Sequence, residues 1–109
     1  MLLRILYFST AHADLTAAEV DAIVSHSVQA NAARDVTGAL AFNGRNFCQL
    51  LEGDELVVRD LIAKISTDKR HSGFKVIDEK RVQDRAFPGW AMQRVRDLDF
   101  SVVINAMTR

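Results

Sequence analysis

VTGALAFNGRNFCQLLEGD, residues 36–54, is the stretch that decides the fold of this 109-residue chain. Two apolar, β-rich segments in it are joined by Asn43-Gly44, a strong hairpin signal because both positions of the matching turn need positive φ. The stretch therefore predicts two antiparallel strands. Gln49 stands in the middle of the second strand, although glutamine is seldom found in a buried strand. The role of this amide is the first question that the sequence raises.

The segment before the hairpin predicts a strand and a helix. LLRILYFST, residues 2–10, is apolar and rich in β-forming residues, as expected of a largely buried strand. Thr16 and Glu19 match a capping box. A helix should therefore begin near Ala17 and run to about Ala32.

The segment after the hairpin predicts a second helix and two more strands. Gly53-Asp54 opens the helix, and the basic cluster 69–71 stands at its predicted end, where the helix dipole favours cations. The predicted apolar stripe of this helix consists of Leu56, Val57, Leu61, Ile62 and Ile65. FKVIDEKRV, residues 74–82, predicts a fourth strand, and WAMQRV, residues 90–95, predicts a fifth. The order β-α-β-β-α-β-β is typical of an α+β, ferredoxin-like sheet with two helices on one face.

The last ten residues, FSVVINAMTR, begin another apolar helical pattern that stops without a cap. This ending suggests either a piece of a longer protein or a helix that docks onto something outside the chain. Val102, Val103 and Ile104 are the residues at which we expect such a contact if they are exposed. A chain of this length fits one domain, residues 1–109.

Composition excludes several classes of protein. Fourteen basic residues balance fourteen acidic ones and no basic block occurs, so nucleic acid is not a predicted partner. The longest apolar run is too short for a membrane span, and the N-terminus lacks the features of a signal peptide, which predicts a cytoplasmic protein. The single cysteine, Cys48, cannot form an internal disulfide, and the three histidines are too far apart to predict a metal site.

Tyr7 and Gln49 should point to the same side of the sheet, because strand side chains alternate between its two faces. If the helices cover that side, a phenol and an amide lie buried together. An unpaired buried polar group costs about 1–3 kcal/mol, so both side chains need hydrogen-bond partners. They could satisfy each other, or bind a ligand between the sheet and the helices.

The polar and aromatic candidates also have structural interpretations. Tyr7 could be a core tyrosine with a satisfied hydroxyl, and Asn31 could be the stop signal at the end of the first helix. Trp90 and Met92, two residues apart on the last predicted strand, could simply fill the core. The charged cluster at 68–71 could be a solvated helix end.

The spacing of reactive residues predicts no catalytic machinery. Ser9 is close in sequence only to His12, and Glu52 is a lone acid beside a turn. The serines that flank His26 on a helix do not face it. A Gly-rich phosphate loop is also missing from the sequence. Residue spacing alone thus offers no active site, although residues distant in sequence can still assemble one in space.

Five ordered motifs resemble those of the BLUF family, the blue-light sensors that use flavin. The motifs are ILYFS at 5–9, Asn31 five residues before VTG, FCQLLEG at 47–53, D-x-R-H at 68–71 and RAFPGWAM at 85–92. The resemblance implies a noncovalent flavin held between the two helices, with its ring edge near the first and third strands. FAD is the implied cofactor, and FMN and riboflavin are alternatives.

The resemblance also implies a role for each candidate residue. Tyr7 would be the light-driven electron and proton donor, and Gln49 the amide between Tyr7 and the flavin. Trp90 and Met92 lie on the strand that repacks when the signal forms. The further residues implied to bind the cofactor are Asn31, Lys64, Asp68, Arg70 and His71. The family often has a second polar residue just before the Asn, and Ala30 departs from that pattern.

An amide carries a donor and an acceptor on one planar group, so Gln49 can act as a two-state switch. The resemblance thus implies a blue-light photoreceptor domain without chemical turnover of its own, which signals to an effector domain or a separate protein and self-associates as a homo-oligomer. Two alternatives remain. One is a flavin-dependent redox enzyme, and the other is a cofactor-free ferredoxin-like interaction module, which would purify colourless.

Overall fold

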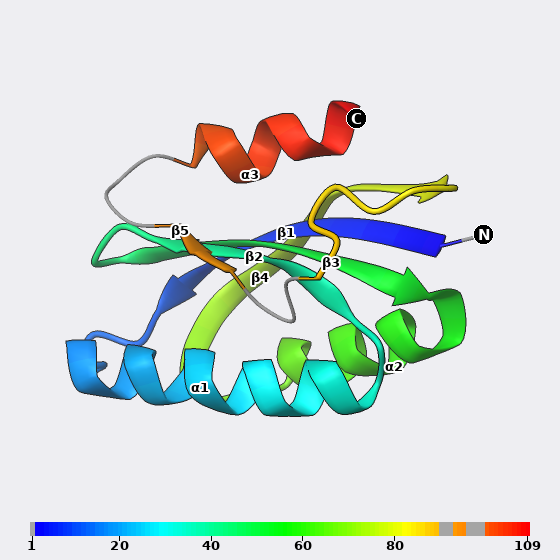
Figure 1. Ribbon diagram of the computed structural model, residues 1–109. Coiled ribbons are helices and arrows are strands. Elements are labelled where there is room, and N and C mark those ends of the chain that lie inside the picture. Colours follow the sequence, from blue (N-terminus) through cyan, green and yellow to red (C-terminus); the bar gives the residue numbers. More distant parts are fainter. Residues whose placement is uncertain (1, 90–92, 96–99) are drawn as a thin grey trace.

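The computed structural model describes residues 2–89, 93–95 and 100–109. Its elements are β1 (Leu2–Ala11), α1 (Ala17–Ala33), β2 (Thr37–Phe42), β3 (Asn46–Asp54), α2 (Glu55–Ser66), β4 (His71–Val82), β5 (Gln93–Val95), α3 (Ser101–Asn105) and the 3-10 turn η1 (Ala106–Thr108). The predicted β-α-β-β-α-β-β order and ferredoxin-like α+β fold are confirmed (Figure 1).

The sheet has the strand order β4-β1-β3-β2-β5 in the described part of the chain. β1 pairs antiparallel with β3 and β4, β2 pairs antiparallel with β3, and β5 runs parallel to β2. Helices α1 and α2 cover one face of the sheet (Figure 1). The C-terminal helix, which we define as α3 with η1, residues 101–108, lies on the opposite face.

Strand alternation divides the core between the two faces of the sheet. Tyr7 and Leu51 belong to the cluster beneath α1 and α2, together with Val20 and Val58 of those helices. The intervening residues of β1 and β3 pack on the other face against the C-terminal helix. That second cluster includes Leu6, Cys48, Leu50, Val103, Ala106 and Met107. Because β1 and β3 are buried on both faces, they read as nearly continuous apolar runs.

The β2–β3 hairpin forms where the sequence predicts it, but its turn differs in detail. Gly44 has a φ of 92°, whereas Asn43 is not among the described residues with positive φ. Asn43 acts through its side chain instead, since its Oδ1 accepts hydrogen bonds from the backbone N–H groups of Arg45 and Asn46 at 3.0 and 2.7 Å. Such local side-chain bonds are the reason that asparagine favours turns.

Both helices begin at the predicted caps. Thr16 Oγ1 accepts from Glu19 N at 3.2 Å and Glu19 Oε1 accepts from Thr16 N at 3.1 Å, which confirms the capping box. α1 runs to Ala33, one residue past the predicted end. Asp54 caps α2, because its Oδ2 accepts from Leu56 N at 3.1 Å.

Two predictions about α2 are wrong. Leu56 is 79% exposed and Val58 is fully buried, so the apolar stripe runs through Val58 and not through Leu56. Residues 58, 61, 62 and 65 share one helix face at the spacing of 3.6 residues per turn. The basic cluster also does not end the helix, since α2 stops at Ser66. His71 instead opens β4, which begins three residues earlier than predicted.

The C-terminal helix packs onto the sheet of its own chain. Val103, Ala106 and Met107 are buried there, while Val102 and Ile104 are exposed. Val102 and Ile104 therefore meet the condition of exposure that the predicted contact requires, whereas Val103 does not. Among the residues that the structure describes, no helix is both long and apolar enough to cross a membrane.

Two glycines in the hairpin allow a matched test of packing against backbone strain. A β-carbon on Gly38 would overlap the backbone carbonyl oxygen of Leu50, whereas one on Gly44 would meet nothing within 4 Å. We expect Gly38→Ala to lower the free energy of unfolding by about 3 kcal/mol, because the clash is with backbone that cannot move aside. Gly44→Ala should cost only about 1 kcal/mol, from its positive φ. Urea denaturation measures both, and equal losses would contradict this packing at Gly38.

Candidate functional site

A cavity of about 240 Å³ lies between the sheet and helices α1 and α2. Its apolar walls come from both helices and from the central strands: Ile23, Leu40, Phe47, Leu51, Leu61 and Ile65. The residues that the sequence predicts as cofactor binders all line it: Tyr7, Asn31, Gln49, Lys64, Asp68, Arg70 and His71. Four parts of the chain that are far apart in sequence, at Tyr7, Asn31, Gln49 and residues 64–71, thus bring these side chains into one place.

Tyr7 and Gln49 form a hydrogen-bonded pair in the cavity. They are direct cross-strand partners in the β1–β3 ladder, so their side chains emerge next to each other on the helix-covered face. The Tyr7 hydroxyl donates to Gln49 Oε1. Tyr7 is 4% exposed and Gln49 is 5% exposed, which places the pair away from bulk water. The two side chains thus hydrogen-bond to each other and also line a cavity that has room for a ligand, so the two sequence-based alternatives are compatible.

The surroundings keep Tyr7 in its neutral phenol form. Burial raises the pKa of the Tyr7 hydroxyl above its ordinary value, and the negative charge of Asp68 adds to the rise. A neutral phenol that donates to an amide carbonyl holds both a transferable proton and an oxidisable ring. Tyr7 can therefore supply an electron and a proton from one side chain.

Asn31 combines the structural role and the site role that the sequence left open. Its backbone carbonyl accepts from Arg34 N at 3.1 Å and from Val36 N at 2.9 Å, so it helps to close the end of α1. The helix nevertheless continues to Ala33. The side chain of Asn31 lines the cavity and the residue is buried. An amide in this position can offer both a donor and an acceptor to a ligand.

Asp68 and Arg70 form an ion pair at the edge of the cavity. Arg70 Nε donates to Asp68 Oδ1 at 2.9 Å, and the backbone N–H of Arg70 donates to the same oxygen at 2.9 Å. These hydrogen bonds lower the pKa of Asp68 to about 2. Lys64, in the last turn of α2, pairs with Asp60 at 3.1 Å. The cavity edge therefore carries fixed charges of both signs.

His71 ties three elements together beside Tyr7. Its Nδ1 lies 2.7 Å from Ser9 Oγ on β1, and its Nε2 lies 2.6 Å from the carbonyl oxygen of Ile65 on α2. A carbonyl can only accept, so Nε2 carries the proton, and in the neutral ring Nδ1 accepts from the Ser9 hydroxyl. Ser9 thus has a histidine partner that sequence proximity to His12 did not reveal.

The cavity is also lined by three polar residues that the sequence did not single out for it: His26, Ser27 and Arg34. With Ile23, Ala30 and Asn31 they follow one face of α1 at helical spacing, and this spacing is the signal that could have identified them. Ala30, the departure from the family pattern, lines the cavity too. The predicted switch residues Trp90 and Met92 lie outside the described residues.

The comparison with known families decides which family this geometry represents. A family model described as sensors of blue-light using FAD, BLUF, matches residues 2–93. The chain belongs to the BLUF family. BLUF domains bind flavin and sense blue light.

Similarity to three named proteins supports this assignment. The chain is 39% identical over 71 residues to the Escherichia coli blue light- and temperature-regulated antirepressor BluF, a match that covers 65% of this chain and 18% of that protein. A structure of Klebsiella pneumoniae BlrP1 with FMN and cyclic diGMP superposes with a TM-score of 0.83 at 34% identity, over 90% of this chain and 26% of BlrP1. A bacterial light-regulated adenylyl cyclase gives a TM-score of 0.86 at 28% identity, over 99% of this chain and 33% of the cyclase. This chain thus spans a third or less of each of these proteins.

The cavity of this BLUF chain fits a flavin on chemical grounds. Its apolar walls suit the flat faces of an aromatic ring system, and buried amides with a phenol suit its polar edge. Gln49 and Asn31 come from different elements, β3 and α1, so they can address different polar atoms of one planar ligand. Lys64, Asp68 and Arg70 lie at or just after the end of α2, where they can bind a polar chain attached to the ring.

Arg70 should control the ionisation of Asp68. In Arg70→Gln the pKa of Asp68 should rise from about 2 toward its ordinary value of 3.8, because the hydrogen bonds and charge of the guanidinium are lost. The pKa is lower in the folded state than in the unfolded chain. The pair therefore stabilises the fold above about pH 4, and this contribution is lost as the pH falls through about 2. Carbon-13 NMR titration of the Asp68 carboxyl measures the shift.

The matched control for this titration is Arg59→Gln, which removes an arginine that pairs with Glu55 and Glu79 instead. The pKa of Asp68 should stay at about 2 in that variant. A low pKa that survives in Arg70→Gln would show that another group holds the carboxylate.

Proposed function

We propose that this chain is the light-sensing part of a blue-light receptor and that Tyr7 and Gln49 form its switch. The observation that carries the proposal is the hydrogen bond from the Tyr7 hydroxyl to the Gln49 amide inside the cavity. The pair combines an oxidisable proton donor with a group that has two hydrogen-bonding arrangements. Membership of the BLUF family supports the same assignment.

A bound flavin would supply the absorption of blue light and an excited state that accepts an electron. Tyr7 then gives up one electron and its hydroxyl proton, and both return to it when the charges recombine. In the interval Gln49 rotates or tautomerises, so that it donates where it previously accepted. The cycle needs no net oxidant or reductant, because Tyr7 ends as it began. What persists is the new hydrogen-bond pattern of Gln49.

We propose FAD as the cofactor, in line with the description of the family. FMN remains an alternative, since BlrP1 has been solved with FMN, and riboflavin is a second alternative. Asn31 would bind the carbonyl edge of the ring, while Asp68 and Arg70 would meet its other polar edge or the ribityl chain. Lys64 and His71 would complete the contacts near the end of α2. Ala30 offers no side-chain donor, so we expect weaker retention of the flavin than with a polar residue there.

The output of the sensor would pass to an effector. The relatives named above include an antirepressor and an adenylyl cyclase, each much longer than this chain. We therefore propose that residues 1–109 act as one sensor domain without chemical turnover of their own, and that an effector domain or a separate protein reads the signal. Self-association and a cytoplasmic location remain predictions from the sequence.

Absorption spectroscopy on the purified protein tests this proposal. The flavin band should move slightly to the red after a blue flash and return in the dark, because Gln49 in its second arrangement donates a stronger hydrogen bond to the flavin. Gln49→Leu should retain the flavin and lose the shift. Gln29→Leu, the same change on an exposed position of α1, is the matched control and should keep the full shift.

Three results would speak against the proposal. A Gln49→Leu variant with the full reversible shift would remove Gln49 from the switch. A yellow protein that bleaches under illumination would favour the flavin-dependent redox enzyme. A colourless protein that does not take up added FAD would leave the cofactor-free interaction module.

A further inference from the structure

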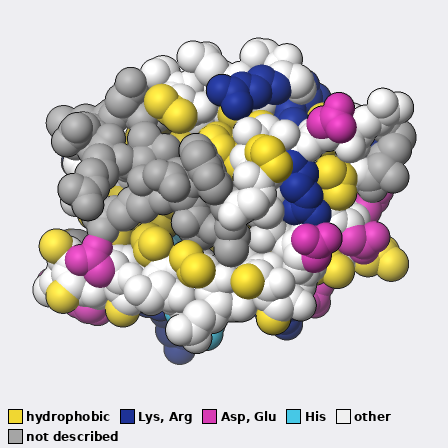
Figure 2. Space-filling model, in the orientation of Figure 1, with side chains coloured by type: hydrophobic (Ala, Val, Ile, Leu, Met, Phe, Trp, Pro, Cys, Tyr) yellow, Lys and Arg dark blue, Asp and Glu magenta, His cyan; other side chains and the backbone are white. Residues whose placement is uncertain are grey.

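A buried ion pair lies on the face of the sheet opposite the cavity. Arg4 of β1 and Glu52 of β3 are 1% and 0% exposed, and Arg4 Nε donates to Glu52 Oε2 at 3.0 Å. The space-filling view shows surface Lys and Arg side chains beside Asp and Glu side chains at the end where the C-terminal helix stops (Figure 2). Arg4 and Glu52 differ from these because water does not reach them. Glu52 is therefore not the lone acid beside a turn that the sequence suggested.

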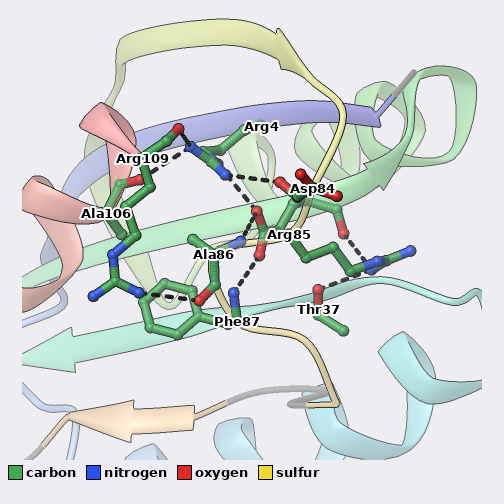
Figure 3. A network of polar contacts seen from close by, with 9 residues as sticks. Arg4, Thr37, Asp84, Arg85, Ala86, Phe87, Ala106 and Arg109 are labelled. Atoms are coloured by element: carbon green, nitrogen blue, oxygen red, sulfur yellow. Dashed lines mark hydrogen bonds and ion pairs between the residues drawn. The ribbon is translucent and has the colours of Figure 1, made fainter.

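Arg4 connects this pair to the end of the C-terminal helix (Figure 3). Its Nη1 donates to the carbonyl oxygens of Ala106 and Arg109 at 3.0 and 2.8 Å, and its Nη2 donates to the carbonyl oxygen of Asp84 at 3.1 Å. The last carbonyls of a helix lack partners within the helix and carry its negative dipole end. One guanidinium thus satisfies the end of the C-terminal helix and the segment after β4.

Glu52 holds the segment that leads toward β5. Its Oε2 accepts from Ala86 N at 3.0 Å and its Oε1 accepts from Phe87 N at 2.7 Å. Arg85, from the same segment, donates to Thr37 Oγ1 at 2.8 Å and to the carbonyl oxygen of Glu52 at 3.1 Å (Figure 3). The two buried charges therefore anchor the C-terminal helix and residues 84–87 to the central strands.

The cavity does not explain these residues. Arg4, Glu52 and Arg85 are not among its lining residues, although Glu52 and Arg85 belong to the motifs FCQLLEG and RAFPGWAM. They are nevertheless tied to it through the backbone. Arg4 and Glu52 are cross-strand partners in the same β1–β3 ladder as Tyr7 and Gln49, three residue pairs away and on the opposite face. A shift of β1 against β3 must move both pairs.

The ion pair is suited to an all-or-none response. A buried charge that loses its partner remains without water to replace it, so a partly broken network is strongly disfavoured. The stable arrangements are a docked C-terminal helix with every contact made, and an undocked helix with the charges in water. A small displacement of the strands can therefore be converted into a change between two discrete states.

We propose that the Arg4–Glu52 pair is a latch that holds the C-terminal helix on the sheet and opens when the Tyr7–Gln49 pair rearranges. Opening the latch frees the end of the C-terminal helix and uncovers the apolar face of the sheet beneath it. The light-driven part of this inference rests on the proposed function. The holding part does not, because it follows from the contacts of Arg4 and Glu52 alone.

Cys48 provides a built-in probe of the latch. It is the only cysteine in the sequence, it is 0% exposed, and it lies in the apolar cluster beneath the C-terminal helix. Burial raises the pKa of its thiol to about 12, which keeps the reactive thiolate scarce while the helix is docked. Undocking exposes the thiol to water and to reagent. The rate of labelling therefore measures how often the latch opens.

The experiment labels the full flavin-loaded chain with a maleimide in the dark and under blue light, with mass spectrometry as the readout. We expect the rate for the unmutated protein to rise at least fivefold under illumination and to return in the dark. The flavin absorption is recorded in the same samples, and illumination without maleimide controls for direct oxidation of Cys48.

Two variants test the charges themselves. Arg4→Lys keeps a positive charge but lacks the planar fork that reaches Glu52, Ala106, Arg109 and Asp84 together. Glu52→Gln removes the negative charge and keeps the shape. Both should label at least tenfold faster in the dark and gain little more in the light. The matched controls are Arg81→Lys and Glu55→Gln, which alter an exposed pair on the helix-covered side of the fold, and both should label like the unmutated protein.

The outcomes separate the latch from the proposed function. A reversible red shift with the same labelling rate in light and dark would overturn the latch and leave the photoreceptor standing. A missing red shift would count against the proposed function, while fast labelling of Arg4→Lys in the dark would still support the holding role. If one variant fails to fold, the other variant and the light–dark comparison on the unmutated protein decide the question. Dark labelling of both variants at the unmutated rate would overturn the holding role.

Discussion

The pairing of β1 with β3 is the constraint on which the rest of the structure depends. These two central strands are buried on both faces, and their register places Tyr7 opposite Gln49 and Arg4 opposite Glu52. The first pair faces α1 and α2, and the second faces the C-terminal helix. One ladder of backbone hydrogen bonds thus sets the geometry of a hydrogen-bonded polar pair on one side and of a buried ion pair on the other.

The sequence predicts the features that depend on local chemistry. The capping box at Thr16, the cap at Asp54 and the alternation that puts Tyr7 and Gln49 on one face all follow from short-range rules. All of the predicted cofactor residues except Lys64 belong to ordered motifs, and the fold gathers them around one cavity. Motif order and strand alternation together therefore predict most of the polar residues that line the cavity.

The features that the sequence did not predict depend on partners distant in the chain. Ser9 meets His71 only because β4 pairs with β1, and Glu52 meets Arg4 only because β3 pairs with β1. Glu52 meets Phe87 only after the segment that follows β4 has folded over the sheet. The sequence wrongly predicts Leu56 in the buried stripe of α2, because this helix has enough apolar residues to form more than one apolar stripe. Spacing in the sequence fixes which residues share a face of one element, but not which element covers that face.

The division of β3 between two faces also limits how this family can change its length. Gln49 serves the cavity, while Cys48 and Leu50 on either side of it serve the other face. One residue inserted into β3 would exchange the two sets beyond the insertion, carrying charge into one core and apolar groups out of the other. The turn at 43–45 has no such restriction, because its residues belong to neither core. Insertions and deletions inherited by related chains should therefore accumulate in the turn, while β3 keeps its length.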